Sequence, residues 1–188
     1  KSLDPKSKSR KQSLEEWGRK ERYLFLKNTL MKDKGHWIMT AHHANDQAET
    51  ILMNLSRKSG VAGLRGISKE NNKVLRPFLD FTKTDILNFS KEIGLAFKED
   101  KTNHDNTIPR NFLRNKILDT WENEFPEVIQ GISRSSNLFC EWSDGLDYMI
   151  SEFIISGLKV RNKKIVLSFK FLKAIPSIVK IRLIQLIT

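Results

Sequence analysis

The sequence predicts an α/β fold, with a parallel sheet in the first part of the chain and a mainly helical region after it. Two short apolar segments, 36–40 and 73–77, are each followed by a segment whose apolar residues have helical spacing. This alternation of strands and helices is typical of parallel sheets. After Pro126 the pattern changes to long helices. We therefore expect one domain over residues 1–124 and an incomplete, mainly helical region over 125–188.

The first elements follow from apolar spacing and from helix-breaking residues. The segment from Gln12 to Met31 has Leu and Trp at helical spacing and no proline, which predicts a helix. Gly35 ends it, and the apolar segment over 36–40 resembles a buried parallel strand. A second helix is expected over 45–55. Three glycines in 57–66 then indicate a loop.

The next elements are set by proline and capping residues. The strand over 73–77 ends at a proline, which cannot donate a ladder hydrogen bond. Thr82 can cap the following helix, and Gly94 can end it. A polar loop over 99–108 leads to a short basic helix. Near the end of the chain we expect a strand over 164–169 and an amphipathic helix over 176–187.

Basic residues are concentrated at the two ends of the chain. The 188 residues include 33 Lys and Arg and 22 Asp and Glu, for a formal net charge of +11. Residues 1–35 carry +6, residues 36–126 carry +1 and residues 127–188 carry +4. Such ends suit a polyanionic partner, because Lys and Arg displace the counterions that condense on phosphates. Charge alone fits a set of solvated surfaces equally well.

Cysteine content and hydropathy exclude several classes of protein. Cys140 is the single cysteine of this sequence, so the chain by itself cannot form an internal disulfide, a CxxC zinc knuckle or an Fe–S cluster. Its apolar runs are far shorter than the roughly 20 residues that cross a membrane. We therefore expect a cytoplasmic protein with no membrane partner. Because the sequence begins with Lys1 rather than Met, we also expect a fragment.

The densest polar cluster, TAHHANDQAET from Thr40 to Thr50, lies where a predicted strand ends and a helix begins. Ligands of open α/β sheets bind at such places. If the helix begins by His42, Asp46 lies on the same face, and the pair can hold an ammonium group or move a proton. Alternatively, Asn45 and Asp46 only cap the helix. A metal site is weakly supported, because the motif is not HExxH and no third ligand has suitable spacing.

Two further segments place cations where an anion could bind. The stretch SGVAGLRG matches no phosphate-loop motif, but its glycines have three cations beside them, Arg57, Lys58 and Arg65. In PRNFLRNK, Arg110 and Arg114 share one helical face, close to the helix N-terminus if Pro109 is its first residue. Each segment predicts either a phosphate contact or a solvated surface.

The order and spacing of these segments resemble the tRNA(Ile)-lysidine synthetase family, whose members are PP-loop ATP pyrophosphatases. The likeness begins near Glu16 and continues through TAHHANDQAETILMNLSRKSGVAGLRGI and LRPFL. It ends in EDKTNHDNTIPRNFLRNKI, which resembles the family's ED-x-[ST]-N and RN-x-[IL]-R signatures. The resemblance implies that residues 1–124 are the C-terminal part of a Rossmann-like PP-loop domain, followed by a helical, tRNA-binding region.

The sequence also departs from this family. Lys58 stands where the family usually has Gly, and Asn45 where it often has Asp. No SGGxDS pyrophosphate loop occurs in the sequence. In the family this loop precedes the segment that matches Glu16 by many tens of residues. We therefore expect an N-terminally truncated chain that is inactive by itself, because it lacks the main ATP phosphate cradle.

The family's activity implies a tRNA-modifying ligase that acts in the cytoplasm. Such an enzyme uses ATP with Mg²⁺ to attach L-lysine to C2 of the wobble cytidine of tRNA(Ile) with a CAU anticodon, through an adenylated tRNA. The implied catalytic residues are Asp46 for the lysine ammonium, His42 for proton handling and Arg110 for phosphate charge. The implied ATP-binding residues are Arg19, Arg22, Thr40 and Ala41. The implied tRNA contacts, which position the backbone, are Arg57, Arg65, Asn111, Arg114 and Lys116.

Two other functions stay open at this stage. A PP-loop enzyme that thiolates tRNA would need working cysteines, which a chain with Cys140 alone does not supply. A non-catalytic tRNA-binding fragment fits the basic ends and the missing pyrophosphate loop. The sequence leaves a homodimer and a monomer equally open.

Overall fold

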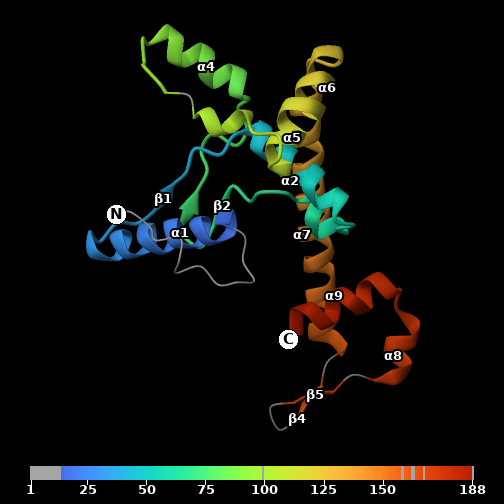
Figure 1. Ribbon diagram of the computed structural model, residues 1–188. Helices are drawn as coiled ribbons and strands as arrows, with labels where there is room; N and C mark the ends of the chain where they lie inside the picture. Colours follow the sequence, from blue (N-terminus) through green and yellow to red (C-terminus); the bar gives the residue numbers. More distant parts are fainter. Residues whose placement is uncertain (1–13, 99, 158, 162–163, 167, 188) are drawn as a thin grey trace.

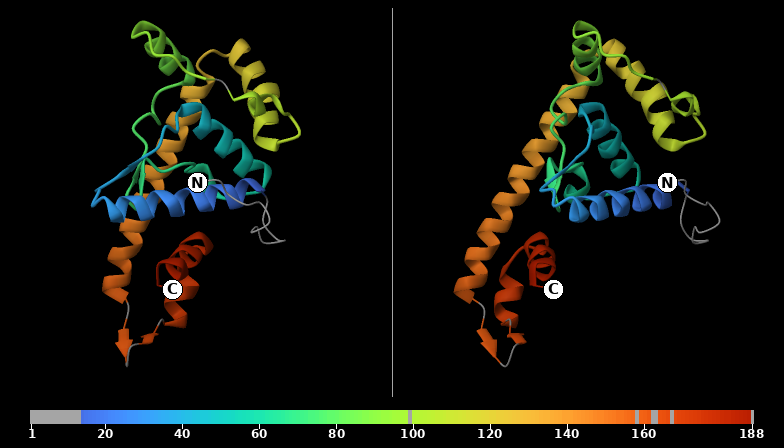
Figure 2. Two further views of the ribbon diagram at one scale, coloured as in Figure 1. Left: turned by 60° about the vertical axis from the view of Figure 1, so that its left-hand side comes forward. Right: turned by 90° about the vertical axis from the view of Figure 1, so that its left-hand side faces the viewer.

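A small mixed sheet and a long helix organise the molecule, which is described here from a computed structural model (Figure 1). The structure describes residues 14–98, 100–157, 159–161, 164–166 and 168–187. In the views of Figures 1 and 2, helix α7 (Val128–Gly157) runs most of the length of the molecule. The sheet and the first helices lie along the first half of α7, and the C-terminal elements lie at its other end.

The sheet has the order β1-β3-β2 and is only partly parallel. Strand β1 (Ile38–Met39) pairs in parallel with β3 (Val74–Leu75), as the sequence predicts. Strand β2 (Glu70–Asn71) pairs antiparallel with β3, which the sequence analysis missed. The reason is the two-residue turn at Asn72 and Lys73, whose φ angles of 47° and 65° are those that favour a tight hairpin.

Helices α1 (Leu14–Lys32) and α2 (Ala44–Ser56) agree with the sequence prediction to within a few residues, the start of the predicted first helix lying outside the described residues. The expected loop over 57–66 contains a short helix, α3 (Val61–Leu64), because Gly60 precedes it in an extended conformation and starts a new turn. Helix α4 (Lys83–Glu92) is capped by Thr82, whose Oγ1 accepts a hydrogen bond from the Asp85 backbone N–H.

The predicted basic helix is a longer, composite helix with a π-helical middle. After the 3₁₀ turn η2 (Lys101–His104) in the polar loop come α5 (Pro109–Phe112), the π-helical segment η3 (Leu113–Leu118) and α6 (Asp119–Glu124) without a break. Pro109 occupies the first turn, where a missing N–H costs nothing. The composite helix therefore connects the loop to α7 and lies against α2.

The hydrophobic core joins α2 to the composite helix and to α7. Its buried cluster is Ala44, Ala48, Leu118 and Ile129, with Leu52, Val128 and Ile132 packed against it. The two alanines on α2 let the neighbouring helices approach closely. The first turns of α7, beyond the expected boundary at residue 124, thus pack on the helix that carries the polar motif.

A buried polar junction also fastens α2 to α7. The Gln47 side chain donates to Ser136 Oγ at 2.8 Å and accepts from the Ile67 N–H at 2.5 Å. Ser136 Oγ in turn donates to the Arg65 carbonyl. Gly66 has a φ of +61°, and a Cβ there would lie 2.5 Å from the Gln47 amide. Only glycine therefore allows the loop to close over Gln47.

The C-terminal region is a hairpin followed by two helices. It consists of β4 (Lys159–Arg161), β5 (Lys164–Val166), α8 (Phe169–Ala174) and α9 (Ser177–Ile187). The expected strand over 164–169 is too long, because Ser168 begins a helical turn and accepts from the Leu172 N–H. Arg182 on α9 donates two hydrogen bonds, of 2.6 and 2.5 Å, to Asp147 on α7. Among the described residues, no helix has the length and hydropathy of a membrane span.

Candidate functional site

Helix α2 begins at Ala44, one residue before the predicted start at residue 45 and two residues after His42, so the condition for pairing His42 with Asp46 is not met. His43 is the N-cap, and its backbone N–H donates to Asp46 Oδ2 at 3.0 Å. His42 therefore lies before the helix and does not share a face with Asp46. Its Nδ1 instead hydrogen-bonds Thr40 Oγ1 at 2.9 Å. The helix starts at Ala44 because the capping bond to Asp46 fixes the residue before it.

A buried carboxylate brings both arginines of the composite helix to α2. Glu49 has no exposed surface, and its two oxygens accept hydrogen bonds of 2.5 Å from Nε of Arg110 and Nε of Arg114. Asp46, one turn earlier, accepts a 3.1 Å bond from Arg110 Nη2. Side chains three and four residues apart lie on the same helical face. The two helices thus meet through a four-residue ionic cluster of Asp46, Glu49, Arg110 and Arg114.

Arg110, one member of this ionic cluster, lines a cleft with a volume of about 560 Å³. The cleft lies between α1, α2 and the start of α5, and its lining residues are Glu16, Arg19, Thr50, Met53, Asn54, Arg57, Pro109 and Arg110. Three of these residues are arginines. Glu49 holds Arg110 through Nε and Asp46 holds it through Nη2, so the position of its guanidinium beside the cleft is fixed. An arginine held in this way is suited to bind an anion.

The arginines of the cleft differ in how firmly they are held. The Arg19 guanidinium lies 5.8 Å from the centre of the Tyr23 ring on its own helix. Arg57 follows the last turn of α2 and is exposed. Arg110 is only about a quarter exposed and is fixed by two carboxylates. The cleft therefore combines one rigid cation with two that can adjust to a ligand.

The imidazole of His42 is kept in its neutral form by its surroundings. Burial lowers the pKa of His42 below its ordinary value of 6.5, opposed by the Asp46 carboxylate and reinforced by the charges of Arg76, Arg19 and Arg110. The pKa of His43 is lowered too, again mainly by burial. At neutral pH both rings can accept a proton. The neutral form is the one that accepts a proton, and the lowered pKa makes each ring a weaker base than a free imidazole.

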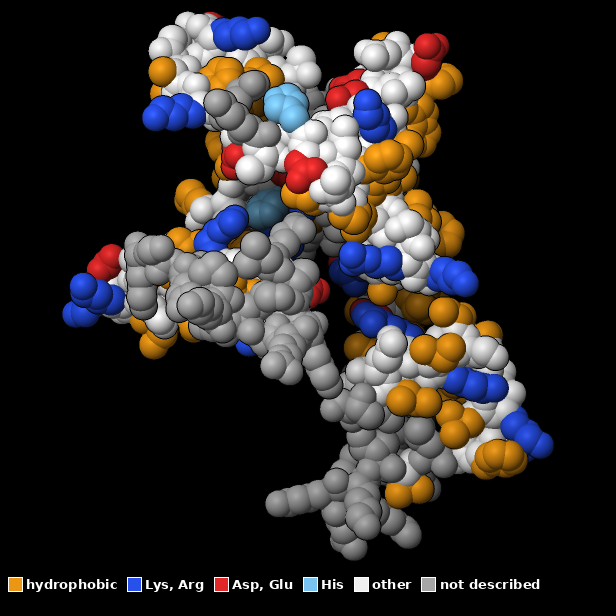
Figure 3. Space-filling view, viewed as in Figure 1, with side chains coloured by type: hydrophobic (Ala, Val, Ile, Leu, Met, Phe, Trp, Pro, Cys, Tyr) orange, Lys and Arg blue, Asp and Glu red, His pale blue; other side chains and the backbone are white. Residues whose placement is uncertain are grey.

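Other residues predicted from the sequence lie at or near this cleft without lining it. Thr40 and Ala41 follow β1 directly and lead to the cap of α2, while Arg22 is exposed on α1. Lys116 is exposed on the π-helical segment. In the view of Figure 3, Lys and Arg side chains stand beside α2 and α3 and again over α8 and α9.

Three predicted tRNA contacts make bonds within the protein. Arg65 donates to Ser143 Oγ at 3.1 Å and forms an ion pair with Asp144 on α7. Asn111 is buried, and its amide donates to two backbone carbonyls of the preceding loop. Arg114 is bound to Glu49, as described above. These side chains shape the surface around the cleft.

Glu49 and His43 were not predicted as site residues from the sequence. A signal for Glu49 existed: it lies three residues after Asp46 and between Ala48 and Ile51, on the side of the helix that faces the core. A carboxylate there must have cationic partners, since an isolated buried charge is very unfavourable. The partners are 61 and 65 residues away, so no local pattern identifies them.

The described residues do not form a metal site. No group of three or more His, Cys, Asp or Glu side chains that could hold a metal ion occurs among them. Asp46 and Glu49, the carboxylates that face Arg110, already bind arginines. These residues do not fit a Mg²⁺ ion.

The fold and the motifs place the chain in a known family. Residues 1–121 match the family model of the PP-loop domain, so the chain belongs to the PP-loop family. Within this domain, β1 leads through a polar turn into α2, and the charged cleft lies beside α2.

Several similar proteins are all named tRNA(Ile)-lysidine synthase. The chain is 38% identical over 128 residues to the tRNA(Ile)-lysidine synthase of Thermosipho africanus, covering 68% of the chain and 30% of the relative. It is 34% identical over 145 residues to that of Chlorobaculum tepidum, covering 77% and 44%. It is 30% identical over 174 residues to that of Caldanaerobacter subterraneus, covering 92% and 37%. The chain spans less than half the length of each of these relatives.

Proposed function

We propose that the chain is part of an ATP-dependent ligase that attaches L-lysine to C2 of the wobble cytidine in tRNA(Ile) with a CAU anticodon. The observation that supports this most directly is the cleft in which Arg110, held by Glu49 and Asp46, lies together with Arg19 and Arg57. The similarity to tRNA(Ile)-lysidine synthases points to the same activity. The proposal is for the whole protein to which the chain belongs.

In this reaction the cytidine C2 oxygen attacks the α-phosphate of ATP, pyrophosphate leaves, and the tRNA is adenylated. The lysine ε-amine then attacks C2, and AMP leaves with the oxygen. Arg110 would stabilise negative charge on the phosphate, since its position is fixed before the substrate binds. Arg19, Arg22, Thr40 and Ala41 would contact the nucleotide. ATP would enter with Mg²⁺, whose ligands would come from the phosphates and from residues outside the described cluster.

The lysine ε-amine must lose a proton before it attacks C2. Asp46 would bind the ammonium form, because its carboxylate is still about one-seventh exposed although it accepts from Arg110 and from the His43 N–H. His42, whose pKa is lowered by burial, would take up the proton. The tRNA backbone would be held by Arg57, Arg65, Arg114 and Lys116, with Asn111 shaping the loop beside them.

The test is an incorporation assay with the full-length reading frame that contains this chain. We expect labelled lysine to enter CAU-anticodon tRNA when ATP is present, and Arg110→Ala to reduce kcat at least 100-fold. Lys116→Ala is the matched control: it removes an exposed cation of the same composite helix and should lower tRNA affinity only modestly. Absence of labelled tRNA from the folded wild-type protein would refute the proposal. The 188-residue chain alone should bind tRNA without turnover.

A further inference from the structure

Arg76 is a buried cation at the carboxyl edge of the sheet. It directly follows β3, and with 9% of its surface exposed it is the least exposed arginine whose side chain the structure describes. Its Nη1 donates to the Ser68 carbonyl at 2.6 Å, whereas its Nε is buried and has no hydrogen-bond partner. No carboxylate of the described residues forms an ion pair with it. A buried charge in this state is unfavourable, and an added anion would relieve the cost.

The unpaired edge of Arg76 is the one that binds carboxylates elsewhere in the molecule. An arginine presents Nε and Nη2 side by side, and these two donors match the two oxygens of a carboxylate. This edge faces carboxylate oxygens in three other arginines: Arg110, Arg114 and Arg182. In Arg182 both donors bind Asp147, at 2.6 and 2.5 Å. Arg76 is less exposed than any of the three, yet its edge faces no carboxylate of the described residues.

The ends of the two parallel strands place Arg76 close to His42. The last residues of β1 and β3 are paired, so the next residues, Thr40 and Arg76, leave the sheet side by side. The Thr40 N–H donates to the Leu75 carbonyl at 3.0 Å, and Thr40 Oγ1 hydrogen-bonds His42 Nδ1 at 2.9 Å. After burial, the strongest influences on the pKa of His42 are the Asp46 carboxylate, which raises it, and the Arg76 guanidinium, which lowers it. One anion and one cation therefore lie close to the His42 ring.

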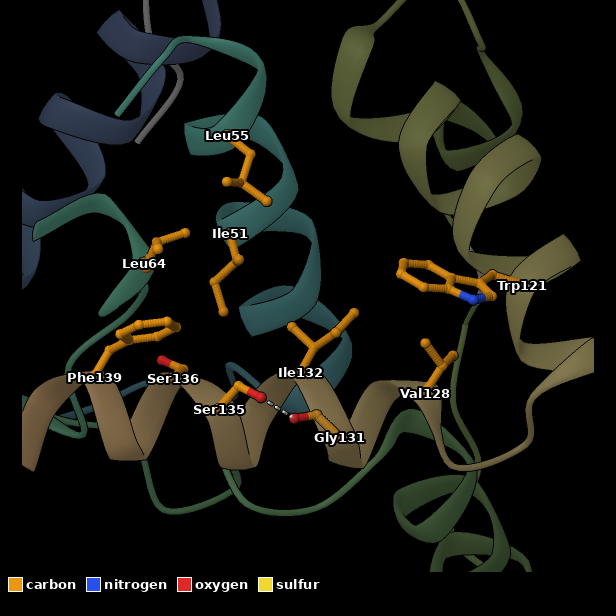
Figure 4. A pocket seen from close by; sticks show the side chains of 10 residues that line it. All are labelled: Ile51, Leu55, Leu64, Trp121, Val128, Gly131, Ile132, Ser135, Ser136 and Phe139. Atoms are coloured by element: carbon orange, nitrogen blue, oxygen red, sulfur yellow. Dashed lines mark hydrogen bonds between the residues drawn. The ribbon is translucent and has the colours of Figure 1, made fainter. Parts of the chain in front are cut away.

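The apolar face of α2 offers no such pair of charges. Figure 4 shows Ile51 and Leu55 of α2 directed toward a groove between α2, α3, α6 and α7. No charged side chain lines this groove, and the Ser135 hydroxyl already donates to the Gly131 carbonyl at 2.9 Å. A ligand with charged ends would lose its hydration there without compensation. A charged ligand is therefore better placed at the carboxyl edge of the sheet, beside His42.

Two kinds of anion enter the proposed reaction, namely phosphates and the α-carboxylate of L-lysine. The three arginines of the cleft are available for phosphates, and Arg76 does not line that cleft. A lysine molecule carries an ammonium at one end and a carboxylate at the other. Such a ligand can pair with Asp46 and Arg76 together, and its ε-amine then lies beside the ring that takes up its proton.

We propose that the Nε–Nη2 edge of Arg76 binds the α-carboxylate of the lysine substrate, while Asp46 binds its ε-ammonium. The inference rests on the proposed function and adds a specificity-determining residue to it. Arg76 would make the site select an amino acid over an amine of the same length that lacks the carboxylate.

Turnover of L-lysine and of L-lysinamide by the full-length protein, each with ATP and CAU-anticodon tRNA, tests this assignment. L-lysinamide keeps the size of the substrate but has a neutral amide in place of the α-carboxylate. We expect the wild-type protein to favour lysine at least about 100-fold in kcat/KM, because the amide leaves Arg76 without an anion. Arg76→Gln should lower kcat/KM for lysine about 100-fold and change that for lysinamide less than about threefold.

The ratio of the two kcat/KM values separates carboxylate binding from a structural role. Any effect of Arg76 on the hairpin or on the proton affinity of His42 acts on both substrates alike and leaves the ratio unchanged. Arg76→Lys keeps the charge but loses the fork, so it should lower the ratio at least about tenfold, and it serves as the test if Arg76→Gln does not fold. Arg182→Gln is the matched control: it removes a carboxylate-bound arginine on α9 and should leave the ratio unchanged.

The possible contrary results have different meanings. Equal losses for both substrates in the Arg76 variants, or a wild-type protein that turns over both equally well, would overturn the inference and leave the proposed function in place. A raised KM for ATP in Arg76→Gln with an unchanged ratio would assign the edge to a phosphate instead. Absence of turnover of either substrate by the folded wild-type protein would refute the proposed function and this inference with it.

Discussion

At the scale of single residues, the site depends most on the buried carboxylate of Glu49. Moving a carboxylate out of water costs several kcal/mol, and only well-placed cations and hydrogen bonds offset this cost. Arg110 and Arg114 supply both through their Nε groups. The side chains of Arg110 and Arg114 are each about three quarters buried. Neither arginine could therefore keep its place if Glu49 were removed. The positions of the two cations therefore depend on Glu49, with Asp46 as a second anionic partner.

Replacing this carboxylate should be costly. Glu49→Gln keeps the size of the side chain but presents amide hydrogens to an arginine and leaves two largely buried cations with Asp46 as their remaining anion. We expect the free energy of unfolding to fall by about 3 kcal/mol. Urea denaturation of the 188-residue chain measures this. Glu92→Gln, at an exposed position on α4, should change it by less than about 0.5 kcal/mol. A loss as small as the control's would mean that the two arginines do not need Glu49.

Some residues of the site can be predicted from the sequence, but the contacts between them cannot. The motif from Thr40 to Thr50 and the Arg110–Arg114 pair were both identified, because each is local and each has a recognisable spacing. That Asp46 and Arg110 meet follows from the packing of two helices 64 residues apart, which no spacing encodes. The start of α2 was predicted to within one residue, but the pairing of His42 with Asp46 required a helix that begins by His42, and the helix begins at Ala44.

At the scale of elements, periodicity and caps identified the helices better than the strands. Helices α1, α2, α4 and α9 have clear spacing or caps, and their positions were predicted. Strands β1 and β3 lie within the apolar segments 36–40 and 73–77 and were predicted, whereas β2 (Glu70–Asn71) is polar and exposed and was missed. Helix α3 and the junction at Gln47 depend on a glycine loop folding back on α2. Tertiary contacts alone determine the conformation of such a loop, and its glycines indicate only that it is a loop.

The residue Lys58, just after the end of α2, has a strained backbone conformation, and a substitution can relieve this strain. Lys58 has a φ of 57°, in the left-handed region, and its N–H donates to the Leu55 carbonyl. Glycine adopts this conformation without a clash between Cβ and the backbone. Lys58→Gly should therefore raise the free energy of unfolding by about 1 kcal/mol. Thermal and urea unfolding measure the change. Lys58→Ala retains the Cβ and should bring no gain; an equal gain from alanine would rule out backbone strain as the cause.

At the scale of the whole molecule, two half-buried histidines, His42 and His43, link stability to pH. Their pKa values are lowered in the folded chain, so the unfolded chain binds more protons below the ordinary value of 6.5. Stability must then rise with pH through this range and fall on acidification. The effect begins at pH 6.5 and precedes the titration of the carboxylates, whose ordinary Asp value is 3.8.

The melting temperature between pH 7.5 and 5 tests this coupling. We expect a plateau above pH 6.5 and a steady decrease below it. A variant with both His42→Gln and His43→Gln should show a much flatter profile over the same range, because neither position can then take up a proton. An equally steep decrease in that variant would show that other groups cause the acid sensitivity.

The π-helical turn between Leu113 and Leu118 has a consequence for how this protein can change over evolutionary time. Upstream of it, Arg110 must point at Glu49; downstream, Leu118 must reach the alanines of α2. Each residue of a helix turns the chain by about 100°. Loss of one residue from this segment would rotate one of these groups away from α2, leaving either the arginines or the core misplaced. Substitutions can accumulate here, but the number of residues between the two arginines and Leu118 cannot drift.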